Sequence, residues 1–162
     1  MCIRDRSVRA ERVEFAYRGG ARVLHGLDVD LPAGAAVAVV GETGSGKTTF
    51  AKLLARLADP TAGRILIGGV DLALMAVGDR HRAVRMVPQD GFLFDTTVAD
   101  NIGYGRSSAR RLDVEAAIDS LGLRWWIDRL PSGRDTRVGE RGESLSGGER
   151  QLVALARAQV AD

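Results

Sequence analysis

The sequence predicts an α/β fold in which an antiparallel β subdomain precedes a core strand and a helical subdomain follows it. Three observations support this fold class. Apolar and polar side chains alternate before residue 35, as in strands with one solvated face. Residues 35–40, AAVAVV, are apolar on both faces and lead into a glycine-rich turn, which is typical of a strand buried in a parallel sheet. Apolar residues recur at helical spacing between residues 97 and 130.

The composition is that of a globular protein and excludes several classes of function. A length of 162 residues suffices for one compact domain with a hydrophobic core. The formal net charge is +2 and the arginines are spread along the chain, so no nucleic-acid partner is expected. No apolar run approaches the ~20 residues that a membrane-spanning helix needs. The single cysteine, Cys2, excludes an internal disulfide and is typical of a reducing compartment such as the cytoplasm.

The N-terminal part is predicted to form a leader and two strands. Residues 1–7, MCIRDRS, have neither an apolar core nor a periodic pattern, so we interpret them as a non-native leader. Residues 8–17 predict a strand, followed by a turn at 18–20. Residues 23–31 predict a second strand that ends at 32–34. The two strands are expected to pair as an antiparallel meander.

The first glycine-rich segment predicts a phosphate-binding loop. Residues 41–49, GETGSGKTT, satisfy G-x-x-x-x-G-K-[ST] between the predicted buried strand and a helix predicted over 47–57. Glycines there let successive N–H groups point at an anion, and the helix N-terminus adds partial positive charge. Lys47 then reaches the outer phosphates, and Thr48 offers its hydroxyl to Mg²⁺. The nucleotide-binding residues predicted in this loop are Gly41, Glu42, Thr43, Gly44, Ser45, Gly46, Lys47, Thr48 and Thr49.

Two further observations indicate what the loop binds. The alternative interpretation is a glycine-rich turn with an incidental lysine, but only Lys47 and Lys52 among the 23 basic residues are lysines. A compact ammonium group suits a point contact with phosphate oxygens. The sole asparagine, Asn101, is not part of the Asn-Lys-x-Asp motif that reads guanine. The predicted cofactors are therefore ATP and Mg²⁺.

The middle of the chain predicts a hairpin, a short strand and then helices. Residues 64–72 are interpreted as a strand, a Gly-Gly turn and a short return strand. Residues 84–87 predict a short strand that runs toward Gln89. Helical periodicity is clearest over 114–121 and 125–130. The two adjacent tryptophans of this part are interpreted as packing residues.

A second glycine pair opens the last predicted helix, in SLSGGERQ (144–151). Ser146 and Glu149 form a capping box, which explains why the helix begins there. The capping box does not explain Gly147 and Gly148, because each glycine costs a helix about 0.5 to 1 kcal/mol relative to alanine. A bare backbone at a helix N-terminus suits an approaching anion, so this turn is also predicted to contact phosphate.

The segments GETGSGKTT and LSGGERQ together resemble the phosphate loop and the signature motif of the ATP-binding cassette (ABC) ATPases, and the resemblance covers nearly all of residues 8–162. In that family two cassettes form a head-to-tail dimer, in which the signature helix of one covers the ATP held by the other. The resemblance thus implies a second ABC ATPase domain as partner. The residues implied to contact the partner's ATP are Leu145, Ser146, Gly147, Gly148, Glu149 and Gln151.

Other residues match positions with known roles in the family. Tyr17, in FAY, matches the aromatic residue that stacks on adenine, and Gln89, in VPQD, matches the Q-loop glutamine that contacts Mg²⁺ and the attacking water. The segments FLFDTTVADNI and TRVGERGESLSGGE resemble the exporter branch, in which Glu140 lies in the loop that touches the coupling helices. The resemblance therefore implies an ATPase domain at the cytoplasmic face of the cell membrane, held there by a fused or associated transmembrane domain.

The resemblance also implies that part of the catalytic machinery is missing. In the family, an aspartate and an adjacent glutamate follow the signature helix, hold the metal and activate water. The chain stops at Asp162 before any such pair, which leaves Gln89 as its predicted catalytic residue. Asp119 and Asp128 lie in helical stretches, so no substitute pair is expected. We expect a P-loop NTPase core without its C-terminal part, and negligible ATP hydrolysis by this chain alone.

Two alternatives stay open at this point. One is a non-transport ABC ATPase acting on DNA or ribosomes, although the residues between the two motifs carry no heptads of a long coiled coil. The other is a nucleotide-binding module that does not hydrolyse ATP. The predicted partial ABC ATPase domain, residues 8–162, divides into antiparallel β (8–34), P-loop core (35–90), a mainly helical subdomain (91–145) and the signature helix (146–162).

Overall fold

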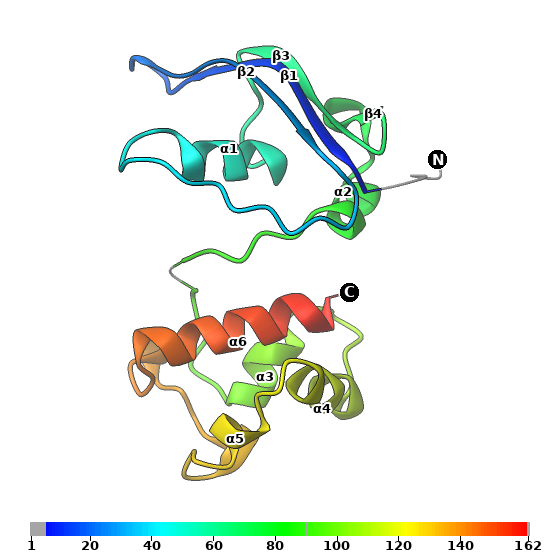
Figure 1. The fold of residues 1–162 in the computed structure, drawn as a ribbon. Helices are drawn as coiled ribbons and strands as arrows, with labels where there is room; N and C mark the ends of the chain where they lie inside the picture. Colours follow the sequence, from blue (N-terminus) through cyan, green and yellow to red (C-terminus); the bar gives the residue numbers. More distant parts are fainter. Residues whose placement is uncertain (1–5, 90, 162) are drawn as a thin grey trace. The chain divides into compact units, whose positions relative to one another are not determined.

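The computed structural model describes residues 6–89 and 91–161, and the chain divides into two compact units, Met1–Met86 and Val87–Asp162 (Figure 1). The first unit is mixed α/β and the second is helical. Of the predicted leader, residues 1–5 lie outside the described residues, so its interpretation stays a prediction. Within the described part of the chain, no helix is long and apolar enough to cross a membrane.

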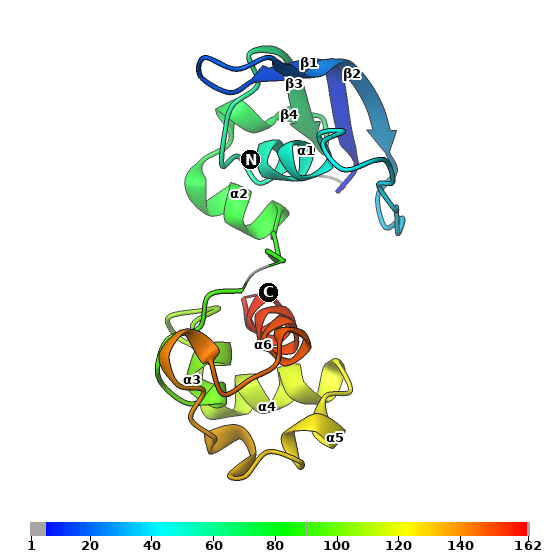
Figure 2. The ribbon, with the colours of Figure 1, turned by 90° about the vertical axis from the view of Figure 1, so that its left-hand side faces the viewer.

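The first unit is built on a four-stranded antiparallel sheet in the order β2-β1-β3-β4. The predicted meander is confirmed as β1 (Val8–Ala16) and β2 (Arg22–Leu31), and the predicted hairpin as β3 (Ala62–Ile67) and β4 (Val70–Asp71). The predicted helix after the glycine-rich loop is α1 (Lys47–Leu54), which lies along one face of the sheet in both ribbon views (Figures 1 and 2).

The core of the first unit explains this arrangement. Buried residues of β1 and β3 pack with Phe50 and Leu53 of α1 in one apolar cluster. A short 3₁₀ helix, η1 (Leu72–Leu74), and α2 (Val77–Ala83) complete the unit. The buried residues that form this core are Ala10, Val13, Phe15, Leu24, Phe50, Leu53, Ile65, Ile67, Leu72 and Met75.

Two predicted strands are wrong. Residues 35–40 are neither strand nor helix, and they are exposed rather than buried, with Val40 85% exposed. Residues 84–87 are likewise irregular. The physical reason is that a strand needs a neighbour for its N–H and C=O groups. In the described part of the chain, every strand pair is antiparallel and none includes 35–40 or 84–87.

The second unit packs its helices around one core. The predicted helical segment contains α3 (Val98–Gly103), α4 (Arg111–Ser120) and α5 (Arg124–Ile127), which is shorter than the periodicity over 125–130 suggested. The last helix is α6 (Gly147–Val160), and α3 and α4 both pack against it (Figure 2). Two 3₁₀ helices, η2 (Gly133–Asp135) and η3 (Glu140–Gly142), lie in the connection before α6.

Candidate functional site

The predicted phosphate loop has the backbone that only glycines adopt readily. Gly44 and Gly46 have φ angles of 88° and 90°, and Gly46 is the N-cap residue of α1. A Cβ atom at Gly46 would lie 2.7 Å from Leu24 Cδ2, so β2 leaves no room for a side chain there. The loop is therefore shaped by its glycines and supported by the sheet behind it.

The Lys47 side chain forms hydrogen bonds with other residues of the loop. Its Nζ donates to the carbonyl oxygens of Gly41 and Glu42, each at 2.7 Å, and to Ser45 Oγ at 3.5 Å. The ammonium group thus lies against the backbone of the loop, where phosphate oxygens can replace carbonyl oxygens as its acceptors. This arrangement fits a polyphosphate cradle.

Tyr17 lies beside the loop and has an accessible ring. Its hydroxyl is 3.1 Å from Thr49 Oγ1, and its ring meets Phe15 edge-on with centroids 4.9 Å apart. The Tyr17 side chain remains 47% exposed, so part of the ring is open to a ligand. Thr49 is buried and engaged with Tyr17, whereas its neighbour Thr48 is exposed.

The second glycine-rich turn begins α6 with the predicted capping box. Ser146 Oγ accepts from the Glu149 N–H at 3.3 Å, and the Ser146 N–H donates to Glu149 Oε2 at 2.8 Å. The other carboxylate oxygen, Oε1, accepts from the indole Nε1 of Trp126 at 3.0 Å. Hydrogen bonds from the Ser146 side chain and backbone, and then from Trp126, hold the pKa of Glu149 below its usual value. Glu149 is therefore a fixed carboxylate.

Gly147 and Gly148 have no internal reason to be glycine. Neither has a positive φ angle. A Cβ atom at Gly148 would meet no atom within 4 Å, and one at Gly147 would meet only the Arg150 guanidinium, at 3.9 Å. Since neither backbone strain nor internal crowding requires them, the glycines leave an open surface at the start of the helix.

The remaining predicted residues belong to the second unit. Gln89 lies in an irregular segment, where its carbonyl oxygen accepts from Gln151 Nε2 at 3.4 Å. Glu140 begins η3. Leu145 is buried under the turn and anchors it to the core of the unit. The glycine loop thus lies with Tyr17 in the first unit, and Gln89 contacts the signature helix in the second.

The structure also reveals a buried polar hub that the sequence did not indicate. Asn101 is fully buried. Its amide donates to the carbonyl oxygens of Phe94 and Thr97 and accepts from the Phe94 N–H, at 2.9, 3.0 and 2.9 Å. Arg157 of α6 donates to Asn101 Oδ1 at 3.1 Å and to the Asn101 carbonyl at 2.9 Å. The hub ties α6 to α3, and no local pattern around Asn101 marks it in the sequence.

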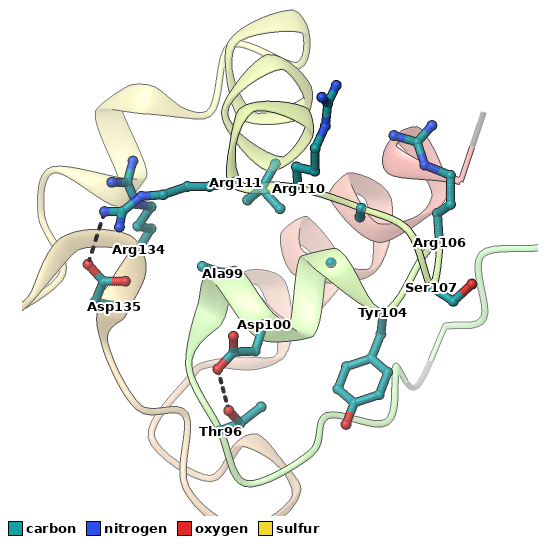
Figure 3. A pocket seen from close by; sticks show the side chains of 13 residues that line it. Thr96, Ala99, Asp100, Tyr104, Arg106, Ser107, Arg110, Arg111, Arg134 and Asp135 are labelled. Atoms are coloured by element: carbon teal, nitrogen blue, oxygen red, sulfur yellow. Dashed lines mark hydrogen bonds and ion pairs between the residues drawn. The ribbon is translucent and has the colours of Figure 1, made fainter.

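A cavity of about 680 Å³ in the second unit is a less suitable anion site (Figure 3). Four arginines line it, but each forms an ion pair with an acidic side chain, such as Arg111 with Asp135 at 3.8 Å. Asp100, also in its wall, accepts from the hydroxyls of Thr96 and Thr97, which lower its pKa. Arg106 and Arg110 share Asp113, so all four guanidinium groups already contact a carboxylate, which makes this cavity a poorer phosphate site than the two glycine-rich turns. The lining arginines are Arg106, Arg110, Arg111 and Arg134.

Comparison with known proteins gives one consistent result. The family model described as "ABC transporter" matches residues 24–162. An ATM1-type heavy metal exporter of Novosphingobium aromaticivorans is 48% identical over 154 residues, which make up 95% of this chain and 25% of that protein. The human mitochondrial iron-sulfur clusters transporter ABCB7 is 44% identical over 156 residues, 96% of this chain and 21% of that protein.

Two further matches agree with these. The ATP-dependent lipid A-core flippase of Chromohalobacter salexigens is 45% identical over 98% of this chain and 28% of that protein. A solved structure of a bacterial Atm1-family ABC exporter with ATP bound is 46% identical, with a TM-score of 0.92 over 100% of this chain and 29% of that chain. The chain therefore spans between a fifth and a third of the length of the relatives it matches.

Proposed function

Because the chain belongs to the ABC transporter family, we propose that it is the ATP-binding part of an exporter that couples ATP binding and hydrolysis to transport across a membrane. The observation that carries this proposal is the open glycine pair at the start of α6, which has no internal explanation and suits a phosphate. The glycine-rich loop of the first unit also supports the proposal, because its backbone and Lys47 suit the phosphates of a nucleotide.

In this proposal the first unit binds its own ATP. Tyr17 stacks on the adenine ring, and the backbone N–H groups of residues 41–49 surround the phosphates. Lys47 exchanges the loop carbonyls for the outer phosphate oxygens. In the first unit the Thr48 hydroxyl would hold Mg²⁺, which supplies charge neutralisation on the phosphates when it is bound. The Mg²⁺ contact expected of Gln89, which belongs to the second unit, stays a prediction.

The signature helix is proposed to serve a second ATP. Gly147 and Gly148 present bare N–H groups, Ser146 adds its hydroxyl, and Leu145 fixes the turn to the core. The ligand would be the ATP of a second ABC ATPase domain in a head-to-tail dimer. Glu140 in the connection before α6 is proposed to face a transmembrane domain, which would hold the chain at the cytoplasmic face of the membrane.

The non-transport alternative finds no support among the relatives named above, whose printed names describe exporters, transporters and a flippase. ATP binding without hydrolysis by this chain alone stays a prediction. The positions of Asp119 and Asp128 agree with this prediction. Asp119 lies on α4 and forms an ion pair with Arg124, and Asp128 lies at the C-terminal end of α5. Neither follows a strand, as a metal-holding carboxylate of this family would.

The test compares the two lysines of the chain, which lie on the same helix. Lys47→Ala should weaken ATP binding about 10- to 100-fold, the size of a lost charge-assisted contact. Lys52→Ala, in the last turn of α1, should leave the affinity unchanged. Both are measured by equilibrium binding of radiolabelled ATP. Equal affinities in the two variants would contradict the assignment of the loop.

A further inference from the structure

We propose that Trp126 is a positioning residue for the signature turn, residues 146–148 at the start of α6: its indole N–H holds the Glu149 carboxylate away from Gly147 and Gly148, so that phosphate can reach the turn. This inference rests on the proposed function, since it assumes that the turn receives the ATP of a partner. It assigns a specific task to a residue that otherwise belongs to the hydrophobic core of the second unit.

The position of Glu149 creates a conflict that needs such a residue. A carboxylate in the first turn of a helix is stabilised by the same N–H groups and partial positive charge that attract a phosphate. Two negative groups a few ångströms apart repel each other, and the repulsion grows when a closing interface excludes water. A freely rotating Glu149 side chain would therefore compete with the nucleotide and repel it.

The structure removes this conflict by occupying both carboxylate oxygens. Oε2 accepts from the Ser146 N–H at 2.8 Å, and Oε1 accepts from Trp126 Nε1 at 3.0 Å. The same hydrogen bonds hold the pKa of Glu149 low, so the group stays charged and its direction matters. The carboxylate is held on the side of the N-cap and Trp126, while the two glycines stay open.

The placement of Trp126 makes this hold rigid. Trp126 is 3% exposed, and its ring is fixed in the core of the second unit by α5. An indole has one hydrogen-bond donor and no acceptor, so a ring held in the core points its N–H at a single partner. Trp125, its neighbour, is 56% exposed and lies under the Arg129 guanidinium at 5.3 Å. It therefore offers a matched control for the same chemical change.

The experiment measures ATPase kinetics of the transporter assembled with this chain. Trp126→Phe keeps an aromatic ring in the core and removes the donor. It should raise KM for ATP about three- to tenfold, as expected for the loss of one charge-assisted hydrogen bond, with a smaller change in kcat. Trp125→Phe should leave both constants unchanged. In a Glu149→Gln background the side chain is neutral, so Trp126→Phe should no longer raise KM.

The outcomes separate the possible roles of Trp126. If Trp126→Phe raises KM by the same factor in the wild-type and the Glu149→Gln backgrounds, Trp126 only supports folding and the inference is overturned. No rise in KM in the wild-type background would also overturn it.

A separate variant tests the proposed function itself. Gly148→Asp places a carboxylate directly in the turn, and full ATPase activity in that variant would refute the signature assignment. Loss of activity in Gly148→Asp, together with an unchanged KM in Trp126→Phe, would refute only the role of Trp126. The two failures are therefore distinguishable.

Discussion

Replacing Gly148 with alanine is expected to stabilise the chain and impair its function at the same time. Gly148 lies in the first turn of α6, where its φ angle is not positive and a Cβ atom would meet nothing within 4 Å. The folded chain therefore accepts the methyl group without strain. The unfolded chain loses conformational freedom, which favours the folded state.

The changes in stability and in ATP turnover can both be estimated for Gly148→Ala. Alanine should raise the free energy of unfolding by about 0.5 to 1 kcal/mol, the difference in helix propensity between the two residues. The same methyl group covers N–H donors that the partner's phosphate is proposed to use. A hydrogen bond to a charged group contributes about 1.5 to 3 kcal/mol, so ATP turnover should fall about 10- to 100-fold.

The assay combines urea unfolding of the chain with ATPase rates of the assembled transporter. Gly122→Ala is the control, because Gly122 also has open space but a φ angle of 63°. It should cost about 1 to 2 kcal/mol of stability and leave ATP turnover per folded protein unchanged. If Gly148→Ala raises stability and turnover stays normal, the reasoning about the bare turn is refuted.

Three other predictions test neighbouring parts of the account. Tyr17→Ala should weaken ATP binding by about tenfold or more through lost stacking, whereas Tyr17→Phe should bind nearly normally; fluorescence titration with an ATP analogue distinguishes them. Asn101→Leu should lower the free energy of unfolding by about 3 kcal/mol or more, because buried partners lose their hydrogen bonds, while Ser120→Ala should cost less than about 1 kcal/mol in the same urea titration. The pKa of Asp100 is lowered in the folded chain, so its carboxylate adds to the free energy of unfolding above the ordinary carboxyl pKa of about 4. This contribution is lost as the pH falls through the folded-state pKa. The free energy of unfolding of Asp100→Asn should therefore fall less steeply with acid than that of the wild type, as measured by circular dichroism.

The features that could be predicted from the sequence are those set by neighbouring residues. The glycine-rich loop that leads into α1 and the capping box of Ser146 and Glu149 depend on residues close together in the chain, and the structure contains both conformations. Phosphate binding by the loop stays a prediction. The antiparallel pair at the N-terminus was predictable for the same reason, since alternation and a short turn suffice to indicate it.

The features that could not be predicted depend on residues far apart in the chain. The Trp126–Glu149 bond and the Asn101–Arg157 bond join residues separated by 23 and 56 positions, and no local pattern marks them. The sequence pattern predicts packing for both tryptophans, whereas the fold buries Trp126 and exposes Trp125. Residues 35–40 show the converse error, because an apolar pattern indicates a strand only where a partner strand pairs with it.

The central claim is that the signature turn acts on the ATP of a partner rather than on the ATP of its own chain. The most direct measurement mixes two variants, Lys47→Ala and Gly148→Asp, in a complete transporter whose two ATPase domains both contain this sequence. The ATP concentration is kept below the range in which Lys47→Ala binds ATP, so that neither variant is active by itself. Each mixed pair then contains one site in which an intact loop faces an intact signature turn. The account predicts that ATPase activity reappears in the mixture. Activity that stays at the level of the separate variants would contradict it.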